Sequence, residues 1–161
     1  MISLLLPSRS APAVFAANAF VAFGPDGKVG AGGEIRQSRV LVVEDDYFVS
    51  MEIETVLLDM GCDVVGIAAT GEEAIETAAR EQPDVVLMDI RLAGSLDGIQ
   101  AAKQIHARLG IRSLFVTSHS DLETRRRGEQ ASPIGWASKP FTAHQLTAAI
   151  QTALRALRSK P

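Results

Sequence analysis

The sequence predicts an α/β domain built on a five-stranded parallel sheet, doubly wound, with helices on both faces. Short apolar runs alternate five times with amphipathic stretches between Arg39 and Arg158. The 161 residues suffice for one well-buried domain, and a composition of 47% hydrophobic and 22% charged residues is that of a globular protein. Repeated strand–helix units joined by right-handed crossovers produce this (βα)5 architecture.

The apolar runs supply the strands. Val40–Val43 is rich in β-branched residues and lacks polar alternation, which is typical of a strand buried on both faces. In chain order, the predicted strands are Val40–Val43, Val64–Ala68, Val85–Met88, Leu114–Val116 and Trp136–Ser138.

The stretches between these runs have helical spacing. Apolar residues from Phe48 to Met60 recur at helical intervals, and Gly61 ends that helix. The fourth helix is short and polar. In chain order, the predicted helices are Phe48–Met60, Glu72–Glu81, Asp97–Leu109, Asp121–Gln130 and Thr142–Arg158.

The residues before the first strand follow no such pattern. Ala11–Phe23 is apolar but only thirteen residues long, too short to span a bilayer, and a glycine-rich stretch follows it. We predict a flexible or disordered extension over residues 1–38, the domain over residues 39–158 and a tail over residues 159–161. The alternatives are an apolar segment that docks on a partner or membrane surface, and a translation start assigned too far upstream.

Charge and cysteine content exclude several classes of protein. The net charge of −3 gives no overall reason to bind nucleic acid or an anionic membrane. Its distribution is uneven: residues 1–39, 40–97 and 98–161 carry +2, −12 and +7, which indicates a polarised surface or a pocket where charges converge. The single cysteine, Cys62, forms no internal disulfide, and the three histidines lack metal-site spacing, so a reducing compartment is the simpler expectation.

Polar side chains follow the predicted strands, at the edge of a parallel sheet where ligands bind. Glu44, Asp45 and Asp46 follow the first strand, and Asp89 follows the third. Crowded carboxylates repel one another, and a hard divalent cation with oxygen ligands, most simply Mg²⁺, relieves that repulsion. Asp46 is better explained as a helix N-cap.

The same edge carries a hydroxyl and an ammonium group. Thr117 ends the fourth strand and Lys139 follows the fifth. A hydroxyl that donates a hydrogen bond and a lysine that pairs with phosphate oxygens suit phosphoryl transfer onto a carboxylate. Asp89 is the natural nucleophile because it stands alone at the end of a central strand.

These motifs resemble the receiver domains of two-component response regulators, which have a flavodoxin-like fold. The resemblance covers Arg39 to Leu157. It rests on four motifs in order: Val40-Leu41-Val42-Val43-Glu44-Asp45-Asp46, Pro83-Asp84-Val85-Val86-Leu87-Met88-Asp89, Thr117, and Lys139-Pro140-Phe141.

The resemblance implies a role for each site residue. Asp89 is the phosphoacceptor; Asp45 and Asp89 bind Mg²⁺ directly, Glu44 binds it through water, and the backbone carbonyl of Arg91 completes the shell. Trp136 stands at the switch position, where the family usually has Tyr or Phe; its indole is larger than those rings and has no hydroxyl. Thr117 and Lys139 follow the new phosphoryl group, and the side chains of Arg91 and His119 modulate its loss.

Two segments depart from the family pattern. Leu92–Gly98 lacks the usual proline and is one residue longer than the common loop, which should alter partner contacts more than the site. Arg125, Arg126 and Arg127 make the fourth helix basic; a solvated helix face is the favoured interpretation and a docking patch the alternative.

Together these observations predict a stand-alone, cytoplasmic phosphoacceptor switch. A histidine kinase or histidine phosphotransfer protein donates to Asp89, and an unidentified protein target receives the signal, without direct contact to nucleic acid or membrane. Because three residues follow the last helix, we expect no attached output domain. The resemblance places the output face at the fourth helix, fifth strand and fifth helix, and a homodimer through this face stays open.

Two other classes of function are alternatives to the switch. A Mg²⁺-dependent aspartyl-phosphate phosphatase needs a second acid two residues after its nucleophile, where this chain has Arg91, so we expect no enzyme acting on external substrates. A phosphate-independent binding module is disfavoured by the intact acidic, hydroxyl and lysine positions. Shuttle, phosphate sink and direct regulator are not separated by the sequence.

Overall fold

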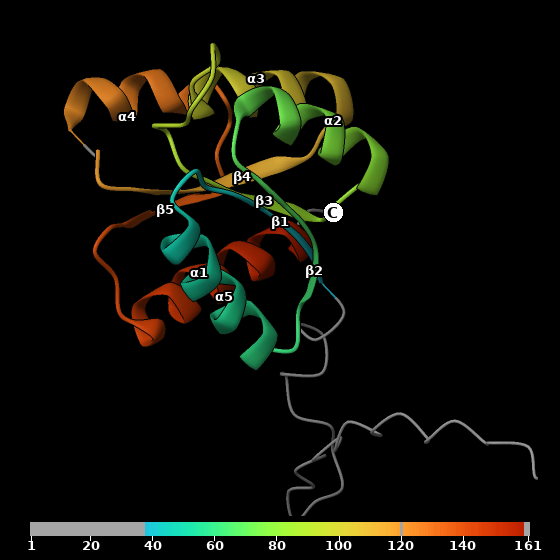
Figure 1. The fold of residues 1–161 in the computed structure, drawn as a ribbon, viewed down its shortest axis with the longest axis vertical. Helices are drawn as coiled ribbons and strands as arrows, with labels where there is room; N and C mark the ends of the chain where they lie inside the picture. Colours follow the sequence, from blue (N-terminus) through green and yellow to red (C-terminus); the bar gives the residue numbers. More distant parts are fainter. Residues whose placement is uncertain (1–37, 120, 160–161) are drawn as a thin grey trace, which may run out of the picture. The chain divides into compact units, whose positions relative to one another are not determined.

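The structure, a computed structural model, describes residues 38–119 and 121–159 and confirms the predicted α/β architecture (Figure 1). Strands and helices alternate along the chain. The strands are β1 (Arg39–Val43), β2 (Asp63–Ala68), β3 (Val85–Met88), β4 (Arg112–Thr117) and β5 (Gly135–Ser138). The helices are α1 (Tyr47–Asp59), α2 (Gly71–Glu81), α3 (Gly98–Leu109), α4 (Leu122–Glu129) and α5 (Ala143–Arg158).

The five strands form one parallel sheet in the order β2-β1-β3-β4-β5. β1 and β3 are neighbours, and their register places Val43 opposite Met88. The residues that follow these two strands therefore emerge side by side at the same edge. On the other side of β3, Thr117 at the end of β4 lies opposite Ser138 of β5, so four strand ends meet there.

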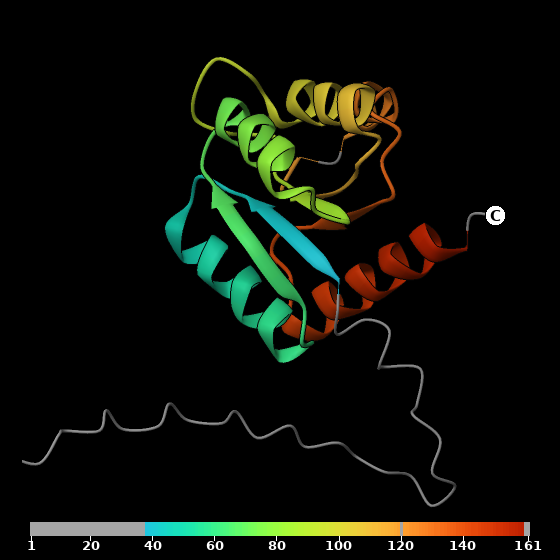
Figure 2. The ribbon, with the colours of Figure 1, turned by 90° about the vertical axis from the view of Figure 1, so that its right-hand side faces the viewer.

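Two layers of helices cover the sheet. α1 and α5 lie on one face, and α2, α3 and α4 lie on the other (Figures 1 and 2). Successive residues of β1 alternate between the two cores: Val40 and Val42 pack toward α1 and α5, whereas Leu41 and Val43 pack toward α2 and α3. All four are at most 1% exposed, which confirms a strand buried on both faces.

The predicted bounds of the elements hold to within one or two residues. Strand β3 has the predicted bounds, and Asp97, Asp121 and Thr142, predicted as first helical residues, are the N-caps of α3, α4 and α5. Their side chains accept hydrogen bonds from backbone N–H groups, so they belong to the helix ends without being helical. Strand β4 begins earlier than predicted, at Arg112. Its first two residues are polar, so the apolar run from which the strand was predicted starts only at Leu114.

Most of the predicted N-terminal extension, residues 1–37, lies outside the described residues. Ser38 is part of the packed domain: it is 2% exposed, and its carbonyl accepts from the N–H of Asp63 at 2.9 Å. Its hydroxyl lies 3.0 Å from a guanidinium nitrogen of Arg158. Within residues 38–119 and 121–159, no helix combines the length and the apolar character needed to cross a bilayer.

Cys62 lies in the core, and we expect its thiol to be unreactive. Its side chain is 6% exposed, and burial raises its pKa although the charge of Arg158 opposes that effect. A thiol reagent should therefore label the native protein roughly a hundredfold more slowly than the urea-unfolded protein, because labelling requires local opening. Equal labelling rates in the two states would contradict this prediction.

Candidate functional site

Three carboxylates gather at the carboxyl ends of β1 and β3. Glu44 and Asp45 directly follow β1, and Asp89 directly follows β3. Because the two strands are adjacent and in register, one carboxylate oxygen from each residue lies within 4.8 Å of the others. Glu44 and Asp89 are buried and Asp45 is exposed, so the cluster opens to solvent on one side.

Lys139 reaches this cluster from the segment after β5. Its ammonium group donates to Asp89 Oδ2 at 2.7 Å and also to Glu44 Oε2. The Lys139 side chain is 14% exposed, and those of Glu44 and Asp89 are 2% and 9% exposed. The sequence separation of these pairs is 95 and 50 residues, so only the fold brings them together.

Burial and charge shift the pKa values of two of these groups in the same direction. Burial raises the pKa of Glu44, and the hydrogen bond and charge of Lys139 offset this only in part. Burial also disfavours the charged form of Lys139, but hydrogen bonds and charges from Asp89 and Glu44 outweigh it and raise the pKa of Lys139. Lys139 is therefore a firmly protonated cation in a site with excess negative charge.

The donor set fits a hard divalent cation. The cluster sets three acidic side chains against one ammonium group, so acidic groups are in excess. All three ligand groups offer oxygen atoms, the donors that Mg²⁺ prefers, and no histidine or cysteine belongs to the cluster. These observations agree with the magnesium site predicted from the sequence.

Hydrogen bonds hold the Asp89 carboxylate in one orientation. Its Oδ1 accepts from the N–H of Ile90 at 2.6 Å and more distantly from that of Arg91 at 3.4 Å. The Asp89 N–H donates to Val43 of β1 at 2.9 Å, and the N–H of Gly98 donates to the Ile90 carbonyl at 2.8 Å. The residue after Asp89 is thus tied to the start of α3.

Thr117 is fully buried at the end of β4, beside this site. Its hydroxyl oxygen accepts from the N–H of His119 at 3.1 Å, and its carbonyl accepts from the N–H of Lys139 at 3.0 Å. Among the described residues, the hydroxyl makes no hydrogen bond to Asp89. The fold therefore places Thr117 at the predicted strand end, and its role toward a phosphoryl group stays a prediction.

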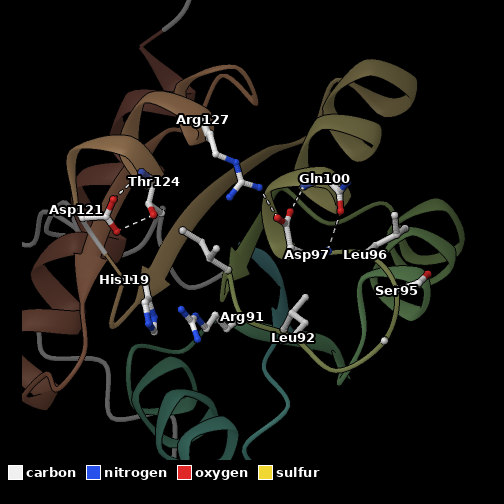
Figure 3. A pocket seen from close by; sticks show the side chains of 12 residues that line it. Arg91, Leu92, Ser95, Leu96, Asp97, Gln100, His119, Asp121, Thr124 and Arg127 are labelled. Atoms are coloured by element: carbon white, nitrogen blue, oxygen red, sulfur yellow. Dashed lines mark hydrogen bonds and ion pairs between the residues drawn. The ribbon is translucent and has the colours of Figure 1, made fainter.

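A pocket of about 510 Å³ opens between the β3–α3 loop and α4 (Figure 3). Arg91 and His119 both line it. Their effect on the loss of a phosphoryl group, which the resemblance implies, stays a prediction. On its far side, the guanidinium of Arg127 pairs with the Asp97 carboxylate, which joins α4 to the N-cap of α3. The sequence offered no signal for this ion pair.

Trp136, the predicted switch residue, is half-buried beneath α4. Its ring centroid lies 4.7 Å from that of Phe115, and the guanidinium of Arg125 lies 5.2 Å from the indole centroid. The indole N–H donates to Glu129 Oε1 at 3.3 Å. A Cβ added at Gly128 would lie 2.5 Å from the ring, so the absent side chain is what makes room for the indole.

Gly128→Ala should displace this ring with a small loss of stability. The added methyl group meets the outer edge of a half-buried side chain, which can rotate away, and alanine favours the helix by roughly 1 kcal/mol. We expect Trp136 emission to shift to longer wavelength while the free energy of unfolding changes by less than about 1 kcal/mol. Unchanged emission would show that the missing side chain at Gly128 does not determine where the Trp136 ring lies.

Two further sets of hydrogen bonds lie near the site, and the sequence predicted only one of them. The Asp46 carboxylate accepts from the N–H groups of Phe48 and Val49, which confirms its predicted role as the N-cap of α1. The β3–α3 loop is tied to α2 by hydrogen bonds from the Ser95 N–H and hydroxyl to Glu72. No local pattern predicted that second contact.

The fold and the site together define a receiver-type domain, with carboxylates and one lysine at the carboxyl ends of a parallel sheet. The response regulator receiver domain family matches this sequence over residues 40–151. Because that match spans more than half of the chain, the protein belongs to this family of two-component signalling domains. Phosphorylation and Mg²⁺ dependence are general features of the family.

Individual relatives agree with this assignment. The transcriptional regulatory protein PdtaR of Mycobacterium tuberculosis is 32% identical over 120 residues, which is 74% of this chain and 58% of PdtaR. The phyllosphere-induced regulator PhyR of Methylorubrum extorquens is 29% identical over 118 residues, 73% of this chain and 43% of PhyR. This chain thus spans about half the length of these curated relatives.

A solved structure gives the same fold. The signal receiver domain of a modulated diguanylate cyclase from Desulfovibrio desulfuricans superposes with a TM-score of 0.70 at 34% sequence identity. The superposition covers 76% of this chain and 97% of that domain. The likeness therefore extends over the whole of a receiver domain.

Proposed function

We propose that this protein is a phosphoacceptor switch in which Asp89 receives a phosphoryl group from a histidine kinase or a histidine phosphotransfer protein. The observation that carries the proposal is the Asp89 carboxylate held 2.7 Å from Lys139 within a cluster of three acids. Such a cluster combines a nucleophile, a fixed cation and oxygen ligands for a metal. We place this signalling in the cytoplasm, with an unidentified protein as target.

In the proposed transfer, a carboxylate oxygen of Asp89 forms a bond to phosphorus while the phosphorus–nitrogen bond of the donor histidine breaks. The bonding electron pair leaves with the imidazole. Lys139 stays protonated and pairs with an oxygen of the transferred group, because its pKa is raised by the acids around it. In this proposal the hydroxyl of Thr117, which ends β4, donates its hydrogen to another of those oxygens.

Glu44, Asp45, Asp89 and the backbone carbonyl of Arg91 would hold Mg²⁺. When bound, the ion neutralises negative charge on the phosphoryl group during transfer. Two hydrogen bonds orient the Glu44 carboxylate: it accepts from the Lys139 ammonium group and from the N–H of Asp46 at 3.2 Å. Asp45 is the exposed member of the set, through which the site stays accessible.

The consequence of phosphorylation is a change in protein contacts rather than turnover of an external substrate. A phosphoryl group adds a charge of about −2 beside Lys139 and Thr117. Thr117 ends β4, and Trp136 lies within the neighbouring strand β5, where its indole N–H donates to Glu129 of α4, so rearrangement at the site would reach the surface of α4, β5 and α5. Trp136 is the proposed switch residue.

Intact mass measurement after incubation with phosphoramidate and MgCl₂ tests this proposal. We expect one phosphoryl group per chain, with no incorporation in Asp89→Asn and greatly reduced incorporation when EDTA replaces MgCl₂. Asp59→Asn is the matched control, because Asp59 is an exposed aspartate at the far end of α1 and its variant should react normally.

The outcome also decides between the switch and the binding module. If Asp89→Asn still took up a phosphoryl group, the acceptor would be a residue other than Asp89. A folded wild-type chain that takes no phosphoryl group from phosphoramidate or from a phosphorylated phosphotransfer protein would overturn the switch and favour a phosphate-independent binding module.

A further inference from the structure

The outer surface of α4 carries charge and apolar area that the fold does not use. Of its eight residues, all described, only Gly128 is buried. Hydrophobic burial therefore explains little of its composition, and its three consecutive arginines need another explanation.

Two of the three arginines have partners within the domain. Arg127 forms the ion pair with Asp97, and Arg125 lies over the Trp136 ring. Arg126 is exposed and makes no hydrogen bond or ion pair with any residue in the described ranges. Its charge is therefore available to a partner at no cost to the fold.

Leu122 adds apolar area next to this free charge. It is 76% exposed, the most exposed large hydrophobic side chain outside α1 in the described part of the chain. Arg126 follows it by four residues, so the two side chains are neighbours on the helix surface. Together with Glu123, Arg127 and Gln130, they line a shallow depression of about 640 Å³.

Helix α3 contributes one more cation at the border of this depression. The Lys103 ammonium donates to Gln130 Oε1 at 2.6 Å. We call Leu122, Arg126, Arg127, Gln130 and Lys103 the α4 patch. The patch holds three cationic side chains around one exposed leucine, with Glu123 as the acid beside it.

We propose that the α4 patch binds an acidic segment of a partner protein, with a large apolar side chain of that segment covering Leu122. Charge complementarity selects the acidic chemistry, since Arg126 and Lys103 lack any carboxylate partner in the described residues. Leu122 selects an amphipathic segment over a purely charged one, because burying it adds apolar contact area. The α4 patch contains no residue of the acidic site, so the proposed binding goes beyond phosphoryl transfer and is tested on the unphosphorylated protein.

The charge distribution favours a protein segment over nucleic acid or a membrane. Proteins that bind duplexes neutralise several phosphates, whereas one of the three cations here is already paired with Asp97. A single exposed leucine also gives little area for insertion into lipid.

NMR titration of the ¹⁵N-labelled full chain with a synthetic amphipathic Glu/Leu peptide tests this inference. We expect chemical-shift changes in the α4 patch, and affinity reduced roughly fivefold or more in Arg126→Glu. Leu122→Ser should weaken binding as well. Arg108→Glu is the matched control: it makes the same charge change at an exposed site in the last turn of α3, and its affinity should change less than roughly twofold.

Each contrary result overturns the proposal. No shifts at millimolar peptide, or shifts outside the patch, would show that α4 does not bind such a segment. If Arg126→Glu and Arg108→Glu weakened peptide binding equally, the net charge of the protein, and not the α4 patch, would account for the binding. Tighter binding of a short DNA duplex or of anionic phosphatidylglycerol vesicles at the same residues would assign the surface to those ligands. The amide spectra themselves show whether each variant is folded.

Discussion

Gly98→Ala is expected to lower the free energy of unfolding by about 3 kcal/mol or more and to distort the segment that carries Asp89. A Cβ at Gly98 would lie 1.8 Å from the carbonyl oxygen of Asp89 and 2.8 Å from its carbonyl carbon. Both obstacles are backbone atoms, so no side-chain rotation relieves the clash. Urea unfolding followed by circular dichroism measures the loss of stability.

Gly110→Ala provides the comparison for this variant. Gly110 caps α3 at its other end with φ of +72°, and a Cβ there meets nothing within 4 Å. An alanine at this position meets no steric obstacle but must adopt a left-handed backbone conformation. Gly110→Ala should therefore lower the free energy of unfolding by about 1 kcal/mol. If Gly98→Ala were no more destabilising than Gly110→Ala, close packing of the start of α3 against the Asp89 segment would be refuted.

Lys139→Met is also expected to destabilise the fold strongly. In metal-free buffer near neutral pH, we expect it to lower the free energy of unfolding by about 3 kcal/mol. The methionine leaves Glu44 and Asp89 buried without the cation that both of them bind. Adding Glu44→Gln to the variant removes one of the two orphaned charges and should restore part of the lost stability.

The pH dependence of this variant follows from the Glu44 carboxyl group. Burial raises its pKa above the ordinary value of 4.5, so the folded state holds a proton that the unfolded chain releases. Stability therefore falls as pH rises from the unfolded to the folded pKa of Glu44, and removing Lys139, which lowers that pKa, extends the fall to higher pH. The deficit of Lys139→Met relative to wild type should shrink between about pH 7.5 and pH 5. A deficit that stays constant over this range would exclude Glu44 as its source.

The sequence was a good guide to the elements because their signals are local. The run Val85–Met88 has no polar interruption, and it forms a strand with those bounds. Asp46 and Thr142 have the side chains that N-caps require, and both cap helices. Placing the acids at strand ends needed only one further rule, that parallel strands end at a common edge.

The contacts that the sequence did not predict join residues that the fold brings together, and no local sequence pattern indicates them. Nothing near Gly128 in the sequence indicates that it makes room for Trp136, eight residues away on another element. Likewise, Arg127 and Asp97 are 30 residues apart, and either would suit an exposed helix end equally well. The arginines expected to form a solvated face are exposed, but two of the three also hold α4 in place.

The distance in sequence between Glu44 and Lys139 has a consequence for folding. Strands β1, β2 and β3 all come from the first half of the domain, and they alone would assemble the three carboxylates. Lys139 arrives only with β5, 95 residues after Glu44. A partly folded N-terminal half would thus contain repelling acids with no internal cation, which disfavours it as a populated intermediate. Charge repulsion at the site therefore makes folding of the two halves more cooperative.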